Sequence, residues 1–311
     1  MKLHKGHIYL MLAFSLAGTS VVTGRSLTGA LDSFAITITG LGLMLLCLFP
    51  FFAVKTLHTI RRLQKPDWAA LFCQALFGIF LFRILLLTGL PLTSTAEAGI
   101  LTGAAPAITA LLAWFFLREP LSAKTALGIL CTVTGIILLQ NNHLTNAALV
   151  WQHTTGNLFV LGAAACESVF NVISRKQRRK DELAKLPIQP LIQTMLVAVA
   201  AGMLCLIPAL WEKSLEPLWS IGWQEWGALL WYGLVITALS FVCFYEGVKY
   251  CDAYTTAALS GLLPLTALLL AVLFWGEAMT YQQWLGGLLV VCSILLLADQ
   301  KKSSTTADDF T

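Results

Sequence analysis

Ten apolar runs follow one another along the chain, separated by polar residues or by Gly/Pro breaks. Each run is close to the roughly 20 residues that an α-helix needs to cross a bilayer. The pattern therefore predicts an all-α membrane protein with ten transmembrane helices. The predicted spans are 7–24, 34–54, 68–88, 95–117, 123–139, 156–174, 189–210, 225–247, 253–275 and 280–298.

The second half of the chain repeats the first. A shift of 158 residues aligns the third to fifth spans with the eighth to tenth without a gap, and a shift of 150 aligns the first span with the sixth. Because each repeat has an odd number of spans, the second must enter the membrane from the opposite side. We predict two inverted five-helix repeats, 7–139 and 156–298, and a cytoplasmic tail at 299–311. The longer shift pairs Gly103 with Gly261, Pro106 with Pro264, Glu119 with Glu277 and Gly128 with Gly286.

Composition supports a membrane protein and excludes a soluble domain. Hydrophobic residues make up 58% of the chain and charged residues 12%, and the mean hydropathy is +0.78. The eight cysteines are scattered through apolar runs with no CxxC pair, so we interpret them as small buried apolar residues.

Lysine and arginine are concentrated in alternate connections, and this predicts the orientation. With the amino terminus in the cytoplasm, the basic cluster at 175–185 lies inside, and only Arg25 and Lys213 fall outside. The positive-inside rule then gives a multi-pass protein of the cell inner (cytoplasmic) membrane with both termini cytoplasmic. The connection at 140–155 is predicted to be an outer loop.

Two segments carry a family resemblance. PAITALLAWFFLREPLSAKTALGILCTVTGIILL and PLTALLLAVLFWGEAMTYQQWLGGLLVVCSILLLAD each contain an early proline, a glutamate at a helix end and a glycine early in the next helix. They resemble the drug/metabolite transporter superfamily, and its EamA group over roughly residues 7 to 299. The resemblance implies a secondary transporter that exports a small metabolite, amino-acid-like or drug-like. One departure is that the family's first helix commonly carries Trp-Gly where this chain has Ala17-Gly18.

Pro106 and Pro264 lie mid-span at equivalent positions of the two repeats. Each removes a backbone hydrogen bond and kinks its helix, and paired interruptions point to a transporter's binding site. With Gly103 and Gly261 beside them, they are candidates for the substrate cavity, although kinks that only shape packing stay an alternative.

Glu167 is the charged residue predicted to lie deepest in the membrane. It is about 11 residues into the sixth span, roughly 16 Å deep at 1.5 Å per residue. Burial disfavours the charged form of a carboxyl group, so Glu167 is a candidate for proton coupling or for binding a cationic solute. Asn171 follows one turn later on the same helix face and joins the predicted cavity. A structural hydrogen bond from Glu167 to a neighbouring helix is the alternative.

The remaining charged positions have local interpretations. Arg83 and Glu97, near the outer ends of the third and fourth spans, are predicted to form a structural or gating ion pair, with anion binding as the alternative. Glu246 and Lys249 are predicted to form a local ion pair. Four residues are assigned to a structural motif of the repeats: Glu119, Glu277, Gly128 and Gly286.

Membrane enzymes need residues that this sequence does not supply. Every histidine is predicted to lie in a loop or at a span end, and no aspartate lies well inside a span, so we predict no catalytic site, metal or cofactor. The expected partners are a small-molecule substrate and membrane lipids, without nucleic acid, for a monomer or homodimer. A membrane-embedded enzyme or lipid-handling protein is the alternative function, because a fold does not determine its function.

Overall fold

The computed structural model describes residues 2–117, 123–140, 147–183, 188–212, 214–251, 256, 259–276 and 280–298. Every regular element in these ranges is a helix, so the all-α prediction is confirmed. Seven helical stretches of the described chain are long and apolar enough to cross a bilayer, and three shorter apolar helices correspond to the other predicted spans. The helices are α1 (Lys2–Leu27), α2 (Ser33–Ile60), α3 (Lys65–Ala75), η1 (Leu76–Leu81), α4 (Phe82–Gly89), η2 (Leu90–Leu92), α5 (Thr95–Thr102), α6 (Ala105–Leu117), α7 (Ala123–Gln140), α8 (Ala147–Leu183), α9 (Pro190–Trp211), η3 (Glu216–Trp219), α10 (Trp223–Leu230), η4 (Trp231–Leu239), α11 (Ser240–Gly247), α13 (Leu262–Trp275) and α14 (Tyr281–Ala298).

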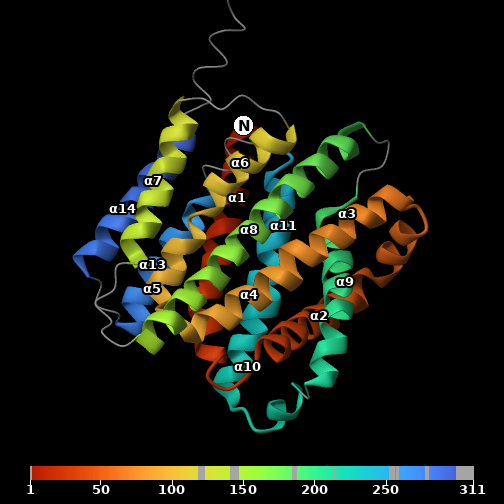
Figure 1. Ribbon diagram of the computed structural model, residues 1–311. Coiled ribbons are helices and arrows are strands. Elements are labelled where there is room, and N and C mark those ends of the chain that lie inside the picture. Colours follow the sequence, from red (N-terminus) through yellow and green to blue (C-terminus); the bar gives the residue numbers. More distant parts are fainter. Residues whose placement is uncertain are drawn as a thin grey trace, which may run out of the picture.

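The helices of the two halves pack in matching pairs. α1 packs against α11 and α13, and its counterpart α8 packs against α4 and α6. α2 lies along its counterpart α9 and α7 along its counterpart α14, on opposite flanks of the molecule (Figure 1). Such exchanged contacts are expected of inverted repeats, because each half completes the packing of the other.

The fourth span is broken where the sequence predicts a kink. α5 ends at Thr102, and α6 begins at Ala105 with Pro106 in its first turn. Between them the backbone amides of Gly103 and Ala104 make short-range bonds to the carbonyls of Ile100 and Leu101. A proline is tolerated in the first turn of a helix, where its missing N–H leaves no bond unmade.

The ninth span has the same construction. α13 begins at Leu262, directly after a turn at Gly261, and Pro264 lies in its first turn. Proline alone does not cause such a break, because Pro50 and Pro208 lie inside the continuous helices α2 and α9. The two broken spans share a glycine three residues before the proline, whereas Pro50 and Pro208 each follow a cysteine at that distance. Glycine favours the interruption, since it is a poor helix former.

The third and eighth spans each contain a π-helical segment. These are η1 (Leu76–Leu81) and η4 (Trp231–Leu239), and the 158-residue shift places the first inside the second. π-helical turns are rare and leave backbone carbonyls without their usual α-helical partners. Here the hydroxyl of Thr237 donates to the carbonyl oxygen of Tyr232 at 2.8 Å, which satisfies one such group.

The sixth helix is longer than its apolar run. α7 extends to Gln140 and α8 covers Ala147–Leu183, so the prediction of an outer loop over 140–155 is wrong for residues 140 and 147–155, while residues 141–146 lie outside the described part of the chain. The polar part of the added turns is Gln152 to Thr155, and His153 lies on one face with Asn157 that packs against the start of α5. Hydropathy alone missed this extension because its stabilising contacts are hydrogen bonds between helices.

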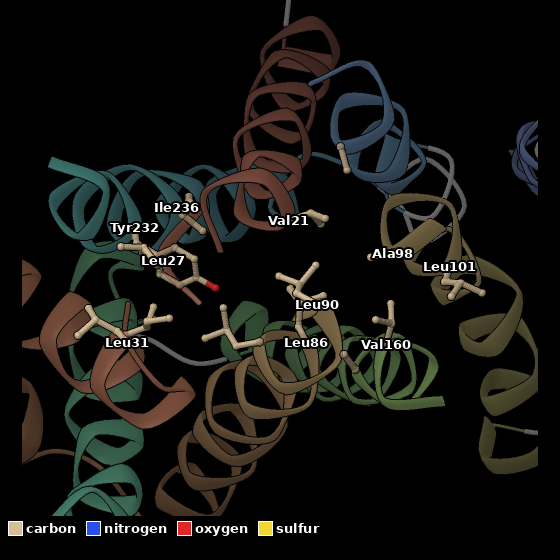
Figure 2. Packing of buried hydrophobic residues seen from close by; sticks show 14 of the residues in the cluster. Val21, Leu27, Leu31, Leu86, Leu90, Ala98, Leu101, Val160, Tyr232 and Ile236 are labelled. Atoms are coloured by element: carbon tan, nitrogen blue, oxygen red, sulfur yellow. The ribbon is translucent and has the colours of Figure 1, made fainter. Parts of the chain in front are cut away.

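The largest buried cluster joins both halves of the chain. It brings α1, α2, α4, α5, α8, η4 and α13 together around aliphatic side chains and one tyrosine. Figure 2 shows Tyr232 among these leucines, with its hydroxyl oxygen reaching into the cluster. The labelled members are Val21, Leu27, Leu31, Leu86, Leu90, Ala98, Leu101, Val160, Tyr232 and Ile236.

Candidate functional site

A cavity lies between helices of both repeats. It contains about 480 Å³ of space free of protein atoms, its open mouth included. Phenylalanine side chains and small residues form most of its wall. The lining residues are Ala13, Phe14 and Ala17 of α1, Gly78 of η1, Phe82 of α4, Glu167, Phe170 and Asn171 of α8, Ser240, Phe241 and Phe244 of α11, and Leu263 of α13.

Among the described residues that line this cavity, Glu167 supplies the only carboxylate. Its Oε2 atom is buried and has no hydrogen-bond partner in the described part of the chain. The 150-residue shift that relates the first and sixth spans pairs Glu167 with Ala17, which also lines the cavity. The two halves therefore contribute equivalent positions to one cavity, but only one of the two positions carries a charge.

The aromatic wall is packed around Phe170, which lies on α8 about one turn after Glu167. The Phe170 ring lies 5.4 Å from the rings of Phe241 and Phe244, measured between centroids. Gly78 makes room for this ring, since a Cβ atom at that position would collide with it. Any side chain at residue 78 would therefore have to displace Phe170.

The chemistry of the cavity suits an amphipathic solute. The aromatic faces attract apolar groups and cations, and Glu167 offers a negative charge to a cationic group. Asn171 adds an amide to the lining. The hydroxyl hydrogen of Ser240 is not available to a solute, because it is donated to the carbonyl oxygen of Ala13 at 2.9 Å.

The predicted kink residues lie beside the cavity and are not among its lining residues. Only Leu263, which precedes Pro264, reaches it. A Cβ atom at Gly103 would contact Val290 and lie 3.3 Å from Cγ of Pro264, so the breaks of the two repeats meet at the crossing of α5 and α13. Their position fits a hinge behind the cavity wall.

Arg83 and Glu97 do not form the predicted ion pair. Nη2 of Arg83 donates to Oγ1 of Thr237, and its guanidinium carbon lies 4.6 Å from the centroid of the Tyr232 ring. Glu97 instead lies 3.1 Å from Nε2 of His153. The two residues have similar predicted depths in the membrane, but depth does not determine which neighbouring helix each side chain faces.

Glu97 is the centre of a buried polar network at the start of α5. Its carboxylate accepts from Nδ2 of Asn157 at 3.3 Å, and the Asn157 oxygen accepts from the hydroxyl of Thr93 at 2.5 Å. Arg25, at the end of α1, donates to the carbonyl oxygens of Leu90 and Thr93. These contacts tie α1, α5 and α8 together at the predicted outer side.

A second polar network lies toward the other ends of the helices. Oε1 of Gln74 accepts from Nε2 of Gln193 at 3.0 Å and from the Tyr245 hydroxyl at 3.1 Å. The predicted local pair is confirmed nearby, with Lys249 Nζ at 2.6 Å from Oε1 of Glu246. The 158-residue shift places Gln74 on Tyr232, the ring beneath Arg83. The two repeats thus position related polar contacts on opposite sides of the cavity.

Sequence reasoning missed His153, Asn157, Gln74 and Gln193 as site residues. The spacing of His153 and Asn157, four apart on one helix face, is a signal that could have found the first pair. Gln74 and Gln193 are polar residues inside apolar runs, as Asn171 is, so hydropathy is a signal that could have found them as well.

The repeat-motif residues divide into two groups. Glu119 and Glu277 lie outside the described residues. Gly128 and Gly286 are buried in α7 and α14, which pack along each other. A Cβ atom at Gly135 would lie 2.8 Å from the Gly286 carbonyl oxygen, so Gly286 lies at a close approach of the two helices.

Within the described residues, no group of three or more His, Cys, Asp or Glu side chains could hold a metal ion.

The profile of the EamA-like transporter family matches residues 4–140 and 154–298, nearly the whole chain. The chain belongs to the EamA-like transporter family. It is 27% identical over 304 residues to the uncharacterized transporter YetK of Bacillus subtilis, an alignment that covers 95% of this chain and 87% of YetK. An uncharacterized transporter of Clostridium kluyveri is 23% identical over 306 residues, covering 96% and 95% of the two chains.

Solved structures support the same fold. One crystal structure matches with a TM-score of 0.63 over 94% of this chain and 95% of its own, at 24% identity. Members of the EamA-like family have two repeats of five helices, in agreement with the paired packing described above. The family and its named relatives indicate membrane transport of a small solute, in a multi-pass membrane protein.

Proposed function

We propose that this EamA-like protein is a secondary carrier that exports a small solute by alternating access, with the aromatic cavity as its solute site. The observation that carries the proposal is that Glu167 lines a cavity built from both repeats, with its Oε2 atom buried and without a partner among the described residues. A buried carboxylate in a membrane is costly unless it meets a partner. A cationic group of the solute, or a proton exchanged for it, supplies that partner.

In this carrier, each of the two polar networks closes one side of the cavity. The contacts around Glu97 and His153 hold α5 and α8 together on one side, and those around Gln74 and Tyr245 hold the third, seventh and eighth spans together on the other. Rocking of one repeat against the other breaks one network while the other stays closed. The direction of net transport, export, is taken from the family resemblance alone.

The protein lies in the cytoplasmic membrane with both termini inside, and functions as a monomer or homodimer. The support for this orientation is the excess of Lys and Arg in alternate connections. Single cysteines at Gln64 and Ser220, both exposed in the fold, test it in a background without native cysteines. On intact cells, an impermeant thiol reagent labels Ser220→Cys and spares Gln64→Cys. The reverse labelling pattern would overturn the orientation.

A comparison of metabolites tests the transport function itself. Cells with and without the gene are compared by untargeted analysis of cell extract and medium, and solutes that change are assayed by counterflow in proteoliposomes. We expect at least one small solute to accumulate outside only when the gene is present and to exchange with saturation in vesicles. The alternative, a membrane-embedded enzyme, predicts conversion of a substrate by the detergent-purified protein with no exchange in vesicles.

A further inference from the structure

Arg83 is a buried cation whose charge has no acidic counterpart among its contacts. Its side chain lies in α4, two residues after the π-helical segment η1, and is 3% exposed. An arginine keeps its charge in proteins, and a charge in the membrane interior is expensive unless it is paired. Arg83 therefore needs a partner that its described neighbours do not supply.

The known contacts of Arg83 leave part of the guanidinium unused. Nη2 donates to Oγ1 of Thr237, whose own hydrogen is already donated to the carbonyl of Tyr232. The face of the Tyr232 ring attracts the cation but carries no net charge. Nη1 is buried without a hydrogen-bond partner in the described chain.

Two further hydroxyl groups in this region are also unsatisfied. The hydroxyl of Tyr232 and Oγ1 of Thr37 are buried and have no partner among the described residues. Thr37 lies on α2, one turn from Gly40, which packs against Gly233 and the Tyr232 ring. The unsatisfied Nη1 of a buried guanidinium favours an acceptor with negative charge.

We propose that Arg83 binds a monovalent anion beside the aromatic cavity, behind the residues that line it. The occupant is chloride or a carboxylate group, since a single buried cation neutralises one negative charge and no more. The position adjoins the solute site, because Arg83 follows Phe82 and Thr237 precedes Phe241 by one turn, and both phenylalanines line the cavity. The anion site is independent of the proposed role of Glu167.

Thermal unfolding of the detergent-purified full-length protein tests the site without a transport assay. The midpoint temperature is measured against sodium chloride and, separately, sodium acetate from 1 to about 150 mM, with ionic strength held constant by the bulky sulfonate of sodium HEPES. A ligand that binds only the folded state raises the midpoint, here by about 4 °C for a millimolar site. We expect this rise in the wild type and its loss in Arg83→Gln.

Arg25→Gln is the matched control. Arg25 has the same charge near the same side, but its guanidinium donates to the Leu90 and Thr93 carbonyls, so the anion response should stay at its wild-type size. If Arg83→Gln does not fold, Arg83→Lys is measured instead. Lysine keeps the charge but lacks the planar guanidinium with its several N–H donors, so this variant should raise the half-maximal anion concentration several-fold.

Comparing the two anions shows whether the occupant is chloride or a carboxylate group. A response to acetate alone indicates a carboxylate of the solute, a response to chloride alone indicates the halide, and a response to both supports the shared site. The proposal is overturned if neither anion shifts the wild type, if Arg83→Gln responds like the wild type, or if Arg83→Lys leaves the half-maximal concentration unchanged.

Discussion

Replacing both Pro106 and Pro264 by alanine is expected to lower the transport rate at least about tenfold while the protein still inserts into the membrane. Each proline lies in the first turn of α6 or α13, where it prevents the broken span from becoming one continuous helix, and the two breaks meet at the crossing of α5 and α13. Alanine returns an N–H group and favours a continuous helix. A tenfold loss corresponds to an increase of about 1.4 kcal/mol in the free-energy barrier of the rate-limiting step. Either single variant should lose part of the rate.

Pro50→Ala provides the control for this prediction. Pro50 is exposed in the middle of α2, which runs without a break from Ser33 to Ile60, so removing it should leave transport unchanged. Initial rates in proteoliposomes are divided by the amount of inserted protein for every variant. Wild-type rates in the Pro106→Ala/Pro264→Ala double variant, at normal abundance, would show that the breaks only shape packing.

The fold could be predicted from the sequence because a membrane makes its signals strong. Every span needs a long apolar run, so the ten helices follow from hydropathy alone. The inverted repeat follows from glycine and proline positions such as Gly103 and Gly261, which match without gaps at a fixed shift. Both the helical class and the family resemblance are confirmed.

The site could be predicted only in part. Glu167 and Asn171 were found because polar side chains in an apolar run are conspicuous, and both line the cavity. The phenylalanines that form its wall could not be separated from lipid-facing or core aromatics, since the spans are apolar on every side. The partners of charged residues could not be predicted either. Arg83 faces η4 and Glu97 faces α8, and a linear sequence does not show how each helix is rotated about its axis.

The central claim is that Glu167 carries the chemistry of transport. Glu167→Gln keeps the size and hydrogen-bonding capacity of the side chain but fixes it in the neutral state. If the carboxylate binds a cationic group or exchanges a proton, the variant should fold and insert normally while losing most of its transport and all of its dependence on pH. A packing role predicts that glutamine is tolerated.

Glu246→Gln is the matched control, because Glu246 is an acid at the end of the eighth span that is paired with Lys249 and does not line the cavity. The deciding measurement is the initial rate of solute counterflow in proteoliposomes as a function of pH, for wild type, Glu167→Gln and Glu246→Gln, with the solute identified by the metabolite comparison. We predict a pH-dependent rate for wild type and Glu246→Gln, and a rate at least about tenfold lower and flat with pH for Glu167→Gln. Identical rates and pH profiles for wild type and Glu167→Gln would contradict the account.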